Sequence, residues 1–151
     1  MRKKSMMKKS ELTPQNVKLA ATYGALSELA HRGYEVTFSV LNTENVDATC
    51  WKTGKSVKKI QIKGMGGPYG IWAKKFLSVE SEDDLFLIVV RVEKDRPLEF
   101  YILTHKEALD AWNKVSWNGK RVSKSGKPYK DDPGLGWKVI CQHRDRWDKL
   151  N

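Results

Sequence analysis

Three polar residues on two neighbouring segments have the types and spacing needed for chemistry on a phosphate group. The segment IQIK at 60–63 alternates apolar and polar residues, and Asp47 lies a short distance upstream. Because side chains alternate between the two faces of a strand, Gln61 and Lys63 share one face. If the two strands pair through the turn at 53–55 with their apolar faces together, Asp47 emerges on the same side. A carboxylate, an amide and an ammonium group are then within reach of one phosphate.

A fourth candidate, Glu28, lies on the helix that the sequence predicts upstream. Thr13 before Pro14 is a typical helix start, and Gly33 is a typical helix end. An apolar stripe at helical spacing comprises Leu19, Tyr23, Leu26 and Ala30. The opposite face carries Glu28 among the small residues Ala21, Gly24 and Ala25. Small residues would let this face approach another element closely and deliver the carboxylate; the alternative is an exposed glutamate on a solvated face.

The elements that position these residues indicate an α+β fold, with an N-terminal helix, a central mixed or antiparallel sheet and a flanking helix. The capping box formed by Thr104 and Glu107 predicts the start of that flanking helix, which runs through Trp112. The glycine-rich segment 64–70 is expected to be a loop. The first three predicted strands have short connections, which favours an antiparallel meander. The predicted strands span 34–41, 46–52, 57–63, 85–92 and 98–103.

Charge points to a polyanionic partner. The chain has 151 residues and a net charge of +10, which fits one domain and favours nucleic acid, DNA in particular, ahead of an anionic membrane. We expect a flexible basic arm at 1–12 and a single domain at 13–151. The stretch 113–130 contains no acidic residue, and its cations suit contacts to phosphates or simply a solvated surface. The residues predicted to bind nucleic acid are Lys120, Arg121, Lys124, Lys127 and Lys130.

Several function classes are disfavoured. Cys50 and Cys141 lie far apart without a CxxC motif, and the three histidines show no HxxxH or HExxH spacing, so a zinc site is not expected. The longest apolar run, 85–90, is too short to span a bilayer, and the basic start lacks the apolar segment of a signal peptide. We therefore expect a reduced, cytoplasmic protein. Six tryptophans could stack on bases or fill the core.

The order of four short motifs resembles the PD-(D/E)XK nuclease superfamily, in particular its Holliday junction resolvase-like members and group I intron homing endonucleases. The resemblance covers roughly residues 15–105. The motifs are GALSE at 24–28, RGYEV at 32–36, VD at 46–47 and IQIK at 60–63. The resemblance implies a restriction-endonuclease-like core, Mg²⁺ or Mn²⁺ as the metal, and hydrolysis of phosphodiester bonds in DNA.

Carried over position by position, Asp47 corresponds to the metal-binding aspartate of the family and Lys63 to its catalytic lysine. Gln61 stands where the family usually has Asp or Glu, and Glu28 fits the acid that the first helix supplies. Val46 replaces a proline of the motif. Mg²⁺ prefers hard oxygen ligands and needs only one or two carboxylates beside phosphate oxygens and waters. Gln61 can still ligate through its amide oxygen, although it brings no charge.

The sequence thus predicts a metal-dependent DNA endonuclease. Cutting both strands requires two active sites, so a homo-oligomer, either a dimer or a tetramer, is expected. One alternative is a nucleic-acid-binding protein on the same fold, in which Gln61 has weakened or abolished catalysis. Another is a basic accessory protein without an active site.

Overall fold

A five-stranded mixed sheet forms the centre of the computed structural model, which describes residues 11–38, 46–116 and 134–151. The strands lie in chain order, and the first three form the predicted antiparallel meander. β3 and β4 are parallel, whereas β4 and β5 are antiparallel. The strands are β1 (Glu35–Phe38), β2 (Ala48–Trp51), β3 (Lys58–Met65), β4 (Leu85–Arg91) and β5 (Glu99–Thr104).

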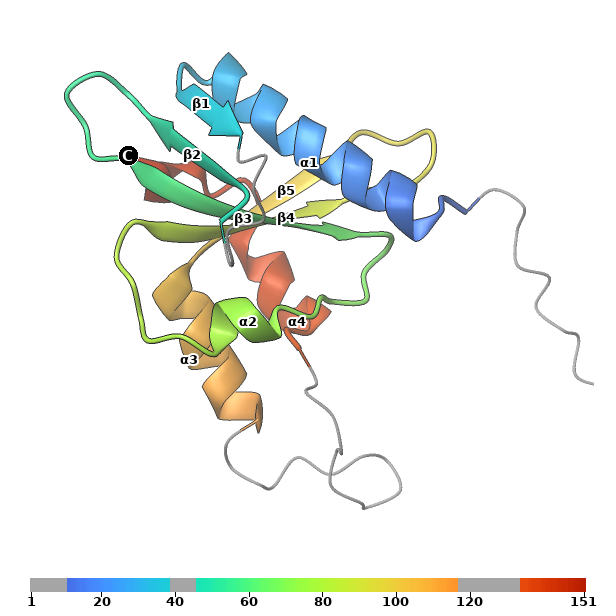
Figure 1. Ribbon diagram of the computed structural model, residues 1–151. Coiled ribbons are helices and arrows are strands. Elements are labelled where there is room, and N and C mark those ends of the chain that lie inside the picture. Colours follow the sequence, from blue (N-terminus) through green and yellow to red (C-terminus); the bar gives the residue numbers. More distant parts are fainter. Residues whose placement is uncertain (1–10, 39–45, 117–133) are drawn as a thin grey trace, which may run out of the picture.

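Helices cover both faces of this sheet (Figure 1). The long helix α1 (Pro14–His31) lies on one face, while α2, α3 and α4 lie on the other. Two parallel strands need a crossover connection, and the one between β3 and β4 contains α2. The remaining helices are α2 (Lys74–Leu77), α3 (His105–Ser116), α4 (Trp137–Ile140) and the 3-10 turns η1 (Cys141–His143) and η2 (Trp147–Leu150). The fold is therefore α+β with an N-terminal helix, as predicted.

The inner strand β4, between β3 and β5, separates the core into two apolar layers. Phe86, Ile88 and Val90 contribute to the layer beneath α1. The intervening residues of β4 face the opposite layer, which packs against α2 and α3. Burial on both faces explains why β4 is an uninterrupted apolar run in the sequence. Among the described residues, no helix is both long and apolar enough to cross a membrane.

α1 begins as predicted but buries a different face. The side-chain oxygen of Thr13 accepts a hydrogen bond from the backbone N–H of Asn16 at 3.2 Å. The predicted apolar stripe is not the buried face: Leu19 and Tyr23 are exposed, whereas Ala21 and Ala25 of the opposite side are buried. The fully buried residues of α1 are Ala21, Ala25 and Leu29.

Close contact between α1 and β3 explains this choice of face. A Cβ atom added at Gly64 of β3 would lie 3.0 Å from a side-chain methyl group of Val17 and 3.1 Å from the Cβ of Ala21. Such contacts are tighter than ordinary packing, so the helix approaches as far as glycine and alanine allow. The small-residue face was therefore correctly predicted to permit a close approach.

Two local predictions can be checked directly. The capping box at α3 is confirmed, because Thr104 Oγ1 accepts from the Glu107 N–H at 3.0 Å and Glu107 Oε1 accepts from the Thr104 N–H at 3.3 Å. The loop predicted at 64–70 begins later than expected. β3 continues through Met65, which pairs with Arg91, since the parallel neighbour β4 still offers backbone partners there.

Candidate functional site

Asp47 lies at the point where β2 separates from β3. Its backbone N–H donates to the carbonyl oxygen of Ile60 at 2.8 Å, and its carboxylate Oδ2 accepts from the N–H of Ile62 at 2.7 Å. The paired register of the two strands ends at Ala48 and Ile60. The carboxylate therefore takes an N–H of β3 that β2 no longer reaches, and this fixes its position.

The start of β2 also corrects one detail of the strand pattern. Strand alternation along the predicted segment 46–52 would place Val46 on the same apolar face as Ala48 and Cys50. Ala48 and Cys50 do belong to the layer beneath α1, but Val46 packs against the opposite layer. The physical reason is that β2 begins at Ala48, so the alternation of a strand does not extend back to Val46.

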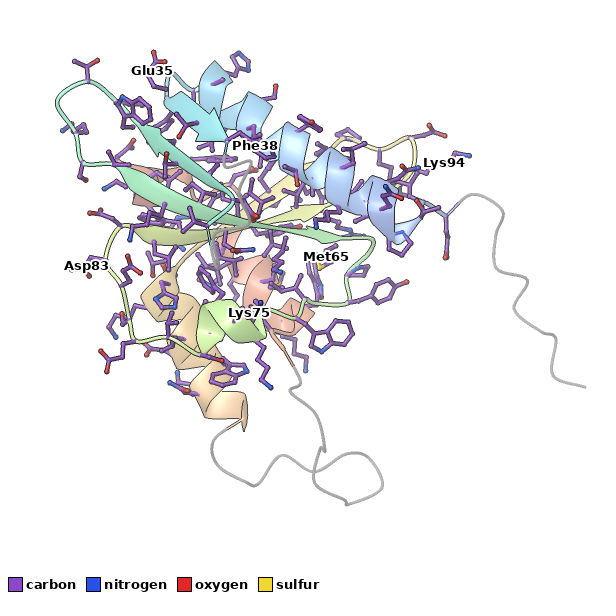
Figure 2. The ribbon with its side chains drawn as sticks, in the orientation of Figure 1. Glu35, Phe38, Met65, Lys75, Asp83 and Lys94 are labelled. Carbon is purple, nitrogen blue, oxygen red and sulfur yellow. The ribbon has the colours of Figure 1, made fainter. Side chains whose placement is uncertain are left out.

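A cavity of about 550 Å³ lies beside this fork, and Asp47, Gln61 and Lys63 all line it. The first half of α1 forms another wall, and the segment between β3 and α2 closes the rim. Figure 2 labels Met65 at the end of β3 and Lys75 on α2, which bracket this rim segment. Residues that the sequence did not single out also line the cavity; they include Val17, Lys18, Thr22, Tyr69 and Ile71.

Gln61 is the polar residue most deeply enclosed at the site. Its exposed fraction is 9%, and it also lines a smaller neighbouring cavity of about 210 Å³ with residues of α2. Among the described residues no hydrogen bond to its side-chain amide is found, and the amide is not one of the fully buried polar atoms that lack a partner, so it keeps contact with the cavity. An enclosed amide that opens on two cavities without a protein partner is suited to receive a ligand.

The electrostatics of the larger cavity favour an anion. Elsewhere in the protein Lys58, Lys106 and Lys149 each pair with a carboxylate at 2.8–2.9 Å. In the part of the chain that the structure describes, neither Lys18 nor Lys63 has such a partner. The described lining of this cavity contains these two cations and one carboxylate, so it carries a net positive charge.

Glu28 is not brought to this site. Its carboxylate accepts from Arg32 on the same helix at 2.9 Å, and it does not line the cavity. The wall that α1 provides ends at Thr22, and six further residues place Glu28 about 9 Å along the helix axis. The prediction that the first helix delivers this acid to Asp47 is therefore not supported by the geometry.

The donor set fits a hard divalent cation held largely by its substrate. Asp47 offers a carboxylate and Gln61 an amide oxygen, both suitable for Mg²⁺ or Mn²⁺. Across residues 11–38, 46–116 and 134–151, no cluster of three or more His, Cys, Asp or Glu side chains could hold a metal. Because Mg²⁺ commonly relies on one or two carboxylates plus substrate phosphates, these two residues alone would bind it weakly.

The predicted phosphate-contacting residues Lys120, Arg121, Lys124, Lys127 and Lys130 lie outside the described residues, as does the basic segment 1–10. The described wall of α1 supplies a different cation, Lys18. Its signal in the sequence was its spacing of four from Thr22, which places both on one helical face. That face could have been chosen only by knowing how α1 packs on β3.

Comparison with protein-family models, curated proteins and solved structures gives no significant match. The resemblance to the nuclease superfamily therefore rests on the four sequence motifs. Asp47, Gln61 and Lys63, which belong to two of these motifs, line the same cavity.

Proposed function

We propose that the protein is a metal-dependent DNA endonuclease with a restriction-endonuclease-like core. The observation that carries the proposal is the convergence of Asp47, Gln61 and Lys63 on one cavity of net positive charge. These would supply a metal-ligating carboxylate, a neutral oxygen donor and a cation, a set suited to phosphodiester hydrolysis. The net charge of +10 gives the chain a long-range attraction for DNA.

Each residue has a distinct role in the proposed reaction. Asp47 and Gln61 would hold Mg²⁺, which when bound supplies a Lewis acid and a water of lowered pKa. The hydrogen bond from Ile62 occupies Oδ2 of Asp47 and orients the carboxylate, so that Oδ1 can serve as the ligand. Lys63 places an ammonium group where negative charge develops on the phosphate. Lys18, from the opposite wall, is placed to bind a neighbouring phosphate.

The test is nicking of supercoiled plasmid in Mg²⁺ or Mn²⁺, with EDTA as the metal-free control. Asp47→Asn should abolish nicking, because it removes the charge that holds the metal. An asparagine oxygen can still accept from Ile62, so the variant should fold normally. Glu35→Gln is a matched control, since Glu35 is exposed on β1 away from the cavity. Nicking by Asp47→Asn at the parent rate would disprove the assignment.

A DNA-binding protein without cleavage is the second candidate. It is favoured by the single carboxylate in the described lining of the cavity and by the neutral amide at Gln61. In that case the parent would cut no form of DNA, yet its affinity would fall steeply with salt as counterions are released. Asp47→Asn would then bind at least as tightly as the parent, because a carboxylate facing a phosphate is lost.

Cutting both strands at one place needs a second active site, so the proposed enzyme acts as a dimer or tetramer. Sedimentation of the protein with and without DNA tests this. A chain that remains monomeric on DNA while producing double-strand breaks in a single binding event would contradict it.

A further inference from the structure

Two large aromatic side chains stand exposed at the rim of the cavity. Tyr69 has an exposed fraction of 81% and Trp72 of 75%, and both line the cavity. They lie on the segment between β3 and α2, next to the proposed catalytic residues. Other exposed aromatics, such as Tyr23, do not line it. Large aromatic side chains with such high exposed fractions beside a cationic cavity are a typical feature of ligand-binding surfaces.

The backbone around Trp72 holds its side chain outward. The neighbours Ile71 and Ala73 are both buried in the layer that faces α2 and α3. Ile71 exchanges two backbone hydrogen bonds with Leu135, at 3.0 Å and 2.9 Å. Because both neighbours are buried while Trp72 is 75% exposed, the side chain of Trp72 lies on the outer side of this anchored segment.

Glycines make this anchoring possible. Gly70 and Gly134 flank the paired residues and have positive φ angles of +99° and +66°. A Cβ at either position would overlap a backbone carbonyl group of the opposing segment. The two segments can therefore approach closely enough to pair only because both positions are glycine. The segment that carries the aromatic rings is therefore fixed by its backbone pairing with Leu135.

Cations accompany the rings. The smaller cavity that shares Gln61 with the larger one is lined by Lys63, Lys74 and Lys75 beside Trp72. Within the described residues no acidic side chain lines this smaller cavity. Proteins bind single-stranded nucleic acid by combining lysines that contact its sugar-phosphate backbone with exposed aromatic rings that stack on its bases.

We propose that Tyr69 and Trp72 form a stacking platform for unpaired bases, and that the site acts on DNA presenting single-stranded or extruded nucleotides. This inference rests on the proposed function, because it names the substrate class of the same site. In a duplex the faces of each base are covered by its neighbours. A ring at the cavity rim can reach a base face only after that base has left the stack, which is easiest in a single strand.

The experiment removes an aromatic ring from the protein by mutation and, separately, one base from the DNA with an abasic nucleotide. Binding of a fluorescent single strand and of the duplex of the same sequence is measured in EDTA. The strand is also made as a series with one abasic nucleotide moved along it. We expect the parent to bind the single strand more tightly than the duplex. Its affinity for the single strand should fall about tenfold when the abasic nucleotide lies at the platform.

Trp72→Ala and Tyr69→Ala should each weaken single-strand binding by about tenfold and remove the sensitivity to the abasic position. Trp72→Phe should restore most of both, because it keeps an aromatic face. Tyr23→Ala is the matched control, since it removes an exposed ring that does not line the cavity. The affinity of Tyr23→Ala should equal that of the parent.

Parent-like single-strand binding by both alanine variants would overturn the platform, and so would equal losses on single strand and duplex. All affinities are measured without metal, so they do not depend on cleavage. If no DNA is cut in Mg²⁺ but the alanine variants lose the sensitivity to the abasic position, the endonuclease proposal fails and the platform stands. If DNA is cut but no coupling is found, the platform alone fails.

Discussion

Lys63 on β3 and Lys149 on η2 differ in the surroundings of their ammonium groups. Lys149 Nζ donates to Glu107 Oε2 at 2.8 Å, to the carbonyl oxygen of Ile102 at 2.9 Å and to His143 Nδ1 at 2.7 Å. Lys63 lines a cavity and has no carboxylate partner among the described residues. An ammonium group has three N–H donors, so Lys149 is saturated while Lys63 is not.

This difference separates a structural lysine from a candidate functional one. The bonds of Lys149 join η2 to β5 and to α3, so they hold the C-terminal segment against the sheet. In the proposed enzyme, the ammonium group of Lys63 would instead form its hydrogen bonds with the substrate. The two lysines should therefore respond differently when each is removed: one through stability, the other through rate.

The largest expected effect follows removal of Lys63. Lys63→Ala should lower the rate of DNA cleavage about 10²–10³-fold, because one preorganised electrostatic partner of the transition state is lost. Its melting temperature should equal that of the parent. Lys55→Ala, in an exposed turn, is the matched control for loss of one positive charge. Single-turnover cleavage and thermal unfolding measure the two quantities; parent-like cleavage would place Lys63 among ordinary surface lysines.

Removal of Lys149 should act on stability. Lys149→Met should lower the free energy of unfolding by about 2 kcal/mol, because Glu107 and the carbonyl of Ile102 lose a charged donor. Cleavage per folded molecule should be unchanged. Urea denaturation measures the loss, with Lys106→Met as the control, since the pair of Lys106 with Asp110 is solvent-exposed. Equal stability of the two variants would contradict the structural role of Lys149.

The smallest effect concerns pH and the same structural cluster. Burial, together with the positive charge of Lys149, lowers the pKa of His143 below its ordinary value of 6.5, although Glu107 opposes this and Arg146 adds to it. The unfolded chain therefore takes up a proton at a higher pH than the folded protein does. This contribution to stability is fully present above pH 6.5 and is lost as the pH falls from 6.5 through the folded pKa.

Urea midpoints measured from neutral to mildly acidic pH should accordingly decrease, and His143→Gln should flatten that decrease. At lower pH Glu107 adds to the loss: burial disfavours its charged form, but hydrogen bonds from Lys149 and Thr104 outweigh this and lower its pKa. A parent midpoint that rises on mild acidification would show that His143 is stabilised in its charged form instead.

Local patterns in the sequence predicted the elements and most of the polar site. Residues close together in the sequence give the signal for each of three features. These are the apolar run of β4, the capping box of α3 and the antiparallel meander of β1 to β3. Alternation along β3 placed Gln61 and Lys63 on one face, and pairing of β2 with β3 brought Asp47 to them. These predictions needed only the two-residue period of strands.

Long-range packing determined what the sequence could not predict. The helical wheel of α1 has an apolar stripe on one side and a small-residue face on the other. The small-residue face is the buried one because it packs closely against Gly64 of β3. That choice brought Lys18 to the cavity and left Glu28 paired with Arg32. The pairing of Ile71 with Leu135, which fixes the rim, joins segments too far apart for any local pattern to reveal.

That pairing also sets when the site becomes complete during synthesis. Asp47, Gln61 and Lys63 leave the ribosome long before Leu135, so a nascent chain carries the reactive groups while Ile71 still lacks its partner. Until Leu135 emerges, the rim of the cavity lacks the backbone pairing with Ile71. The anchored rim therefore forms only after Leu135 has left the ribosome, and a shorter nascent chain carries these side chains without the complete wall of the cavity.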